Sequence, residues 1–226
     1  MKILALGDPH GELPKNLNLI IKNNKIDVIV CIGEVFPINR DKNHGGIADL
    51  KGGERTLDKL CSFKIPVIFF KGNMFLSSWG RNYFRTFLKK YRNRYKNLYY
   101  KGLGVLRIKG ITFVVFDMIY EEHSHRFLSK YFTDKDKNNS RLKRLNRLLH
   151  DNPDALFLSH APPYNYLDKI NSGKHVGSKI LLKAIKKNKP KLVLCGHIHE
   201  AKGKAKIGKT TVYNLGSCGD YKIFNI

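Results

Sequence analysis

Seven polar side chains follow the ends of short apolar segments, and they are of the types that bind metal ions. They are Asp8, His10, Glu34, Asn73, His160, His197 and His199. Each apolar segment predicts a buried strand. Because ligands of open α/β sheets bind beyond the carboxyl ends of the strands, we expect separate loops to bring these carboxylate, amide and imidazole groups to one edge of the fold.

Carboxylate and imidazole ligands suit Mn, Fe or Zn, and the lack of a thiolate in the set argues against a closed structural zinc site. Two such ions about 3.5–4 Å apart hold a phosphoryl group, activate a water and stabilise the attacking and leaving oxygens of a displacement. With one bridging ligand, the set gives each ion four protein contacts and leaves room for water and substrate. The pattern therefore predicts a dinuclear phosphoryl-transfer site.

The elements that position these side chains alternate along the chain. Buried strands are predicted at Ile3–Leu6, Ile26–Ile32, Ile65–Phe70, Ile111–Phe116, Ala155–Leu158 and Leu192–Leu194. Helices are predicted at Leu17–Lys22, Leu57–Ser62, Ser78–Asn97, Ser140–His150 and Ser178–Asn188. A hairpin is predicted at Ala205–Ile207 and Thr211–Leu215, with a last strand at Tyr221–Ile226. The alternation favours βαβ units and a mostly parallel sheet. With no internal repeat or linker, we predict a single α/β domain over residues 1–226.

Five short motifs carry the polar residues. They are Gly7-Asp8-Pro9-His10-Gly11, Gly33-Glu34, Gly72-Asn73, Ser159-His160-Ala161-Pro162-Pro163 and Cys195-Gly196-His197-Ile198-His199-Glu200. In this order the chain resembles the calcineurin-like metallophosphoesterase superfamily over nearly its whole length. Gly173–Leu181 and Leu192–Lys204 look closest to uncharacterised archaeal members. The motifs are specific as a set, whereas any one alone is weak.

The resemblance implies a four-layer α/β/β/α sandwich of two mixed sheets flanked by helices. It also implies that Asp8, His10 and His199 hold one metal ion, that Glu34 bridges, and that Asn73, His160 and His197 complete the second ion's ligands. The implied cofactors are two divalent ions (Mn, Fe, Zn or Ni, with Mn favoured). The same seven side chains would carry catalysis.

Three residues depart from the superfamily pattern. Glu34 stands where Asp is usual, and its extra methylene moves the carboxylate outward by about 1.5 Å, so the backbone or the metal spacing must adjust. Pro37 replaces a further Asp. Met74 replaces a His that assists the leaving group as a general acid; a thioether cannot donate a proton, and loss of a general acid typically costs about 10²–10⁴ in rate. Some phosphodiesterases of the superfamily lack this His and still act.

Simpler interpretations exist for several of these residues. Asp8 and His10 could form an ordinary turn, His197 and His199 a polar loop, and Glu34 a solvated loop acid. A second polar cluster consists of Glu121, Glu122, His123 and His125. It resembles a set of metal ligands, but a polar loop is the favoured interpretation. If it approached the site, His123 or His125 could supply the missing proton donor.

The formal net charge of +24 is the main feature of the composition. Compositional drift toward Lys and Asn is one explanation, but it does not account for the 18 acidic residues beside 42 Lys and Arg. A field this positive attracts polyanions through counterion release, so nucleic acid is expected as partner, RNA more than DNA. The segment Arg81–Lys101 interleaves cations with aromatic residues, which predicts an aromatic core face and a cationic solvent face.

The leading functional prediction is a metal-dependent phosphodiesterase or nuclease-like hydrolase. The alternatives are a catalytically weakened member that binds RNA or the ribosome, and a phosphomonoesterase for small metabolites. The sequence shows no apolar run of membrane-spanning length and no signal peptide. Its four widely spaced cysteines form no disulfide or zinc pattern, so a cytoplasmic protein without membrane association is expected.

Overall fold

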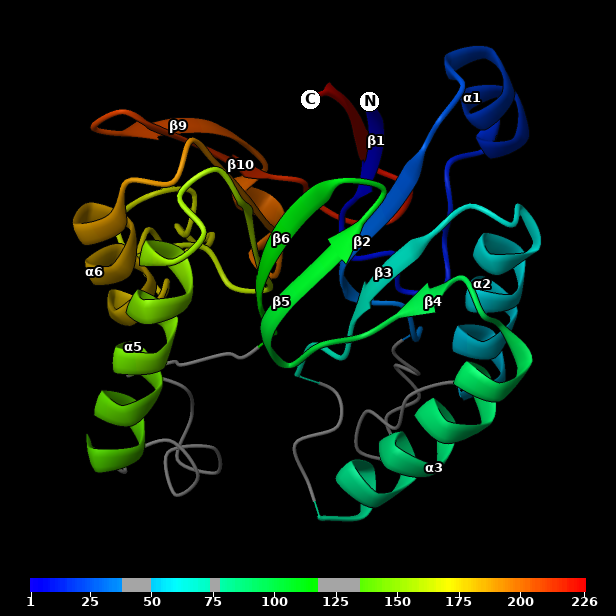
Figure 1. Cartoon of the computed structure of the whole chain (residues 1–226), viewed down its shortest axis with the longest axis horizontal. Helices are drawn as coiled ribbons and strands as arrows, with labels where there is room; N and C mark the ends of the chain where they lie inside the picture. The colour runs from blue at the N-terminus through cyan, green and yellow to red at the C-terminus, as the bar shows by residue number, and fades with distance from the viewer. Residues whose placement is uncertain (38–49, 74–77, 118–134) are drawn as a thin grey trace. The chain divides into compact units, whose positions relative to one another are not determined.

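The computed structural model describes residues 1–37, 50–73, 78–117 and 135–226 (Figure 1). The chain divides into two compact units. Unit 1 comprises Met1–Tyr100 together with Ser217–Ile226, and unit 2 comprises Lys101–Gly216. Each unit contains one sheet with its own helices, so the chain forms two mixed sheets with flanking helices, as the resemblance implied.

The sheet of unit 1 has five strands in the order β11-β1-β2-β3-β4. Their bounds are β1 Lys2–Leu6, β2 Val28–Glu34, β3 Val67–Phe70, β4 Leu98–Tyr99 and β11 Tyr221–Asn225. The four strands β1 to β4 run parallel, and β11 joins β1 antiparallel. Every residue of β2 and β3 is buried, which is why these strands read as continuous apolar runs rather than alternating ones.

Three helices pack on one face of this sheet: α1 Leu17–Asn24, α2 Leu50–Ser62 and α3 Ser78–Arg94. Alternate strand residues such as Leu4, Ile29 and Phe69 belong to the same buried cluster as residues of these helices, as the two-residue period of a strand requires. From α3, Phe87 stacks on Tyr91 with ring centroids 4.4 Å apart. The aromatic side of α3 is thus core, as its spacing predicted.

The sheet of unit 2 has six strands in the order β5-β6-β7-β8-β10-β9. Their bounds are β5 Leu103–Ile108, β6 Ile111–Phe116, β7 Leu156–Ser159, β8 Leu192–Cys195, β9 Gly203–Ile207 and β10 Thr210–Asn214. The strands β6, β7, β8 and β10 are parallel, and antiparallel partners complete both edges. Helices α5 Lys135–His150 and α6 Lys179–Asn188 share one buried cluster with this sheet. The Ser178 side chain caps α6 by accepting from the Leu181 N–H.

Most predicted elements are confirmed, with differences at the ends. The helix predicted to reach Asn97 ends at Arg94, because the Asn97 amide donates to the carbonyls of Cys61 and Ile65 and Leu98 then pairs with β3. Helix α2 begins seven residues before its predicted start at Leu57. The prediction missed β4, which has two residues, and β5, an edge strand. The single domain over residues 1–226 stays a prediction.

Among the helices of the described segments, none combines the length and the apolarity needed to cross a membrane.

The four cysteines provide a test of this fold, because three are buried and Cys218 is exposed. Burial, followed by the charge of Asp8, raises the pKa of Cys31 well above its usual value. Burial, followed by Asp58, raises the pKa of Cys61 to about 12. Only thiolates react rapidly, so at pH values near 8 we expect a disulfide reagent to label Cys218 fast and the other cysteines only after unfolding. The control Cys218→Ser should leave no fast-reacting thiol; a second fast thiol in the native protein would contradict the packing.

Candidate metal centre

In unit 1, the turn after β1 holds Asp8 with its side chain only 1% exposed. Its Oδ1 accepts the backbone N–H of Glu34 at 3.0 Å, and its backbone carbonyl accepts the N–H of Cys218 at 2.9 Å. The turn is therefore attached both to the end of β2 and to the segment before β11. A charged group held by backbone donors in this way is fixed in position before any ligand arrives.

His10 is oriented by the neighbouring loop. Its backbone adopts a left-handed φ of 46°, and its N–H donates to the Glu34 carbonyl at 2.9 Å. The Nδ1 atom lies 3.3 Å from the Phe36 carbonyl, which only accepts, so Nδ1 carries the proton. The Nε2 atom then lies 3.9 Å from Oε2 of Glu34. At this distance Nε2 of His10 makes no hydrogen bond to Glu34, but its lone pair can share a cation with that carboxylate.

The longer side chain at Glu34 is accommodated by Gly72. A Cβ atom on Gly72 would lie 2.2 Å from Cγ of Glu34, and Gly72 has a φ of +66° that favours glycine. The β2–β3 register also shifts between Cys31 and Glu34, which re-aims the side chain at the strand end. The extra methylene therefore occupies space that glycine leaves open, and the backbone adjusts just before the carboxylate.

Asn73 follows Gly72 and completes this group. Its backbone N–H donates to Oε1 of Glu34 at 2.6 Å. Its side-chain Oδ1 is buried and has no hydrogen-bond partner among the described residues. A buried acceptor without a donor is costly, and a carbonyl oxygen beside a carboxylate is a suitable ligand for a divalent cation. The residues of unit 1 thus fit a bound metal ion.

In unit 2, three histidines follow two neighbouring parallel strands. His160 follows β7 and is fully buried, and its ring centroid lies 4.9 Å from that of His197, which follows β8. The two turns are joined by a hydrogen bond from the Gly196 N–H to the His160 carbonyl at 2.9 Å. His197 has a left-handed φ of 70°, and His199 begins the short 3-10 helix η1 (His199–Ala201). The structure thus brings the imidazoles of His160 and His197 together at adjacent strand ends.

Asn214, at the end of β10, fixes the turn between His197 and His199. Its side chain is 2% exposed, and its Nδ2 donates to the carbonyls of Ile198 at 2.8 Å and Leu167 at 3.1 Å. Its Oδ1 accepts the N–H of Gly216 at 3.0 Å. Both amide hydrogens and the oxygen are thus used, so a single buried side chain connects three loops. Asn214 is not among the residues predicted from the sequence, because a strand pattern alone does not show which polar residue points inward.

A buried carboxylate at Asp168 organises the loop after His160. The side chain is fully buried, and its Oδ2 accepts the N–H groups of Asn165 at 3.0 Å and Gly177 at 2.8 Å. Its Oδ1 accepts from Nδ1 of His175 at 2.6 Å. The loop that Asp168 closes supplies the Leu167 carbonyl to Asn214, so it also supports the His197–His199 turn. Asp168 too was missed, since nothing in its sequence context distinguishes it from a turn residue.

The structure brings the predicted site residues together in two sets. Asp8, His10, Glu34 and Asn73 form one set within unit 1, and His160, His197 and His199 lie on adjoining turns of unit 2. Pro37 packs against Gly11, where a Cβ would lie 2.4 Å from the proline Cγ. Met74, Glu121, Glu122, His123 and His125 lie outside the described residues.

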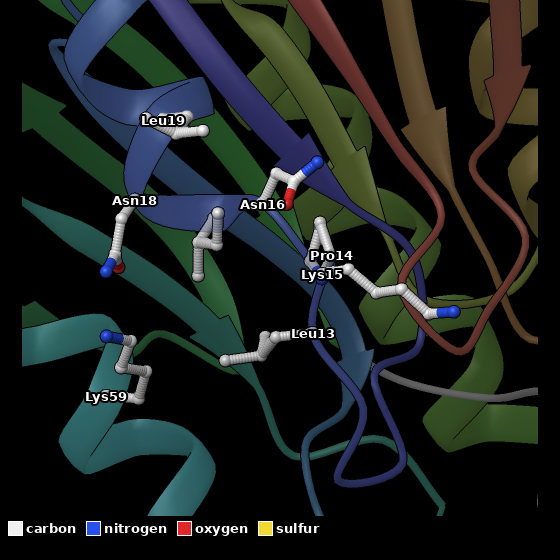
Figure 2. A pocket seen from close by; sticks show the side chains of 8 residues that line it. Leu13, Pro14, Lys15, Asn16, Asn18, Leu19 and Lys59 are labelled. Carbon is white, nitrogen blue, oxygen red and sulfur yellow. The ribbon is translucent and has the colours of Figure 1, made fainter.

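A cavity of about 320 Å³ lies elsewhere in unit 1, where α1 begins (Figure 2). It is lined by Leu13–Leu19 together with Lys59 of α2. These residues include neither a carboxylate nor an imidazole, so this cavity lacks the ligands of a metal centre. The chemistry of the site resides in the strand-end loops.

A sequence profile of the calcineurin-like phosphoesterase family matches residues 1–201. The chain belongs to this family. The family name denotes hydrolases of phosphate esters, and the family resemblance implies a dinuclear divalent metal site, which agrees with the donor set described above. The resemblance inferred from the five motifs is thereby confirmed.

Three known proteins are similar to this chain over most of its length. An uncharacterised protein of Methanocaldococcus jannaschii is 27% identical over 95% of this chain and 87% of its own length. A crystal structure of a dimetal phosphatase from Danio rerio has a TM-score of 0.63 at 11% identity, covering 99% of this chain and 91% of that chain. The Plasmodium GAP50 structure, described as an anchor in the inner membrane complex, has a TM-score of 0.54 at 18% identity and covers 97% of this chain and 71% of that chain. At these identities the two structures show that the fold is shared.

The close approach of Gly72 to Glu34 gives a test of the metal centre. We expect Gly72→Ala to displace the Glu34 carboxylate, because the new methyl group would occupy the place of its Cγ atom. Bound divalent metal per chain, measured by elemental mass spectrometry, should fall to about half or less.

Gly110→Ala is the matched control for this variant, since Gly110 also has a positive φ, of +79°, but nothing lies within 4 Å of its Cβ position. Both variants should lose about 1 kcal/mol of unfolding free energy from backbone strain. Only Gly72→Ala should lose metal. Equal metal content in the two variants would contradict the proposed place of Glu34.

Proposed function

We propose that this family member is a dinuclear metal-dependent phosphodiesterase that hydrolyses nucleic-acid or nucleotide phosphodiesters. The observation that carries the proposal is the buried Oδ1 of Asn73, which has no hydrogen-bond partner among the described residues. The backbone N–H of the same residue donates to the buried carboxylate of Glu34. A solvated polar loop would leave neither group buried. A divalent cation supplies the positive charge that such acceptors require.

The ligand set is the one that the family resemblance implies. In that set Asp8, His10 and His199 would hold one ion, Asn73, His160 and His197 would hold a second, and Glu34 would contribute to both. The metal pair would polarise the phosphoryl group and activate a water for attack on phosphorus. Among the ions that this donor set accepts, Mn is favoured because carboxylate and carbonyl oxygens stand beside imidazole nitrogens.

The chain's own residues would orient these groups before substrate binds. The Phe36 carbonyl keeps the proton on Nδ1 of His10 and leaves Nε2 for the metal. The Glu34 N–H fixes one carboxylate oxygen of Asp8. Asn214 holds the turn that carries His197 and His199. The imidazoles of His160 and His197 would help to neutralise charge on the phosphoryl oxygens.

The leaving group sets the choice of test substrate. Met74 stands where the superfamily has a proton-donating His, and a thioether donates no proton. Without that donor, esters of weakly acidic alcohols should react about 10²–10⁴-fold more slowly than they would at a site with the proton-donating His. The leaving group of an aryl phosphodiester departs as a stabilised phenolate, so hydrolysis of this ester does not require the proton donor.

We therefore expect metal-loaded protein to hydrolyse bis(p-nitrophenyl) phosphate, with Mn more effective than Mg. Asp8→Asn should lower kcat/KM by more than about 100-fold, which exceeds the usual effect of a residue outside the ligand set. Asp151→Asn is the matched control, because Asp151 is an exposed acid paired with His150, and it should retain full activity. No hydrolysis of this diester with Mn or Zn across several pH values would overturn the proposal.

A second candidate is a catalytically weakened member that binds RNA or the ribosome. Glu34, Pro37 and Met74 favour it, together with the net charge of +24. The GAP50 structure carries a name that describes an anchor, and it shares the fold. This candidate predicts that wild-type turnover is undetectable and that Asp8→Ala and His197→Ala leave RNA affinity unchanged.

A phosphomonoesterase of small metabolites would instead show turnover that RNA does not inhibit.

A further inference from the structure

In unit 2, helices α5 and α6 lie side by side (Figure 1). Both helices carry exposed cations. The two helices are joined by a hydrogen bond from Asn188 to Asn146 at 2.7 Å, and their apolar faces belong to the buried cluster of unit 2. Their exposed cations define what we call the α5–α6 surface. They are Lys143, Arg144, Arg147, Lys183, Lys186, Lys187 and Lys189.

The two helices that form this surface contain few acidic residues. Helix α6 contains no acidic residue, and α5 contains only Asp136, near its beginning. No ion pair joins these seven cations to an acid of the described residues; Arg144 donates to the Leu103 carbonyl instead. By contrast, α3 of unit 1 packs against the acids of α2, with Lys90 3.3 Å from Glu54 and Arg94 3.5 Å from Asp58. The cationic helices are therefore not equivalent: α3 has acids beside it.

Helix stability explains only part of this charge. Cations in the last turn of a helix interact favourably with its dipole, which accounts for Lys186 and Lys187 in α6 and for Arg147 in α5. Lys143 and Lys183 lie earlier in their helices and have no such role. Their charge serves either solubility or the binding of a polyanionic partner. Seven cations on two adjoining helices create a positive field that attracts a polyanion, which favours the second role.

The spacing and composition of the surface indicate how such a partner is contacted. Lys143 and Arg147 are one turn apart, as are Lys183 and Lys187, so cations repeat about every 6 Å along each helix. Neither helix contains Phe, Tyr or Trp. Proteins that bind single strands stack bases on aromatic side chains, whereas contacts to phosphates require only cations and carry no base information. The chemistry therefore fits a regular phosphate backbone.

We propose that the α5–α6 surface binds the phosphate backbone of double-stranded nucleic acid, without reading its base sequence. The inference rests on the nucleic-acid part of the proposed function and assigns a place to it. The proposal also gives a smaller role in nucleic-acid binding to α3, which lies in the segment where cations alternate with aromatic residues. Because none of the seven cations is a predicted metal ligand, binding at this surface is separable from hydrolysis of a small phosphodiester.

The test compares two double charge reversals that are matched in charge, spacing and exposure. Lys183→Glu with Lys187→Glu alters the α5–α6 surface, and Arg85→Glu with Lys89→Glu alters the exposed side of α3. Affinity is measured by fluorescence anisotropy with a labelled RNA duplex of about two helical turns and with the DNA duplex of the same sequence. The α6 variant should bind the RNA duplex at least about tenfold more weakly, and the slope of log K against log salt should fall by about 2.

The α3 variant should stay within about threefold of wild type. Lys183→Gln with Lys187→Gln avoids acidic residues at the helix end and should weaken binding in the same direction, and circular dichroism should show that all variants remain folded. Both α6 variants should hydrolyse bis(p-nitrophenyl) phosphate at the wild-type rate, so that a failure here is distinct from failure of the proposed enzyme. Equal losses in the α6 and α3 reversals, unchanged binding in the α6 variants, or tighter binding to single-stranded RNA would each overturn the assignment. Weaker binding to the DNA duplex alone would assign the surface to DNA.

Discussion

The loops of unit 1 depend on one constraint: two carboxylates are buried near each other and must be compensated. Asp8 is 1% and Glu34 is 4% exposed. Burial of charge costs several kcal/mol per ion unless hydrogen bonds and opposite charge offset it. The backbone N–H of Glu34 compensates one oxygen of Asp8, and that of Asn73 compensates one of Glu34. These bonds tie the ends of three parallel strands together. A divalent cation would complete the compensation, which would join the stability of these loops to the proposed chemistry.

Unit 2 differs from unit 1, because its candidate ligands are imidazoles, whose ring orientation must be fixed for metal binding. The turns after β7 and β8 are joined through the Gly196 N–H and the His160 carbonyl. Asn214 and Asp168 then fix the surrounding loops from within the protein. Both side chains are fully or almost fully buried, and their hydrogen bonds go mainly to backbone groups. Ordered loops of this kind present histidines in fixed orientations, which a metal site requires.

The departures from the family pattern have different physical consequences. The longer side chain of Glu34 is matched by the open space at Gly72, so it need not prevent metal binding. Pro37 gains a packing role against Gly11. The exchange at Met74 concerns proton transfer, and no packing change replaces a proton donor. We therefore expect the site to retain metal binding but to have a reduced rate of hydrolysis with poor leaving groups. The cations of the α5–α6 surface are not predicted metal ligands, so the role proposed for that surface is separate from catalysis.

The sequence by itself determined which strands are buried, the order of the elements and the seven ligand candidates. Continuous apolar runs such as Ile111–Phe116 exist only where both faces of a strand are covered, and polar residues directly after such runs mark loop positions. It did not determine the end of α3, where side-chain bonds from Asn97 to Cys61 and Ile65 take over from helical periodicity. Nor did it reveal Asn214, Asp168 or the space at Gly72. The Nδ2 bonds of Asn214 join residues 16 and 47 positions apart, and the space at Gly72 depends on a side chain from another strand end. The bonds of Asp168 are local, but the direction of its side chain is not visible in the sequence pattern.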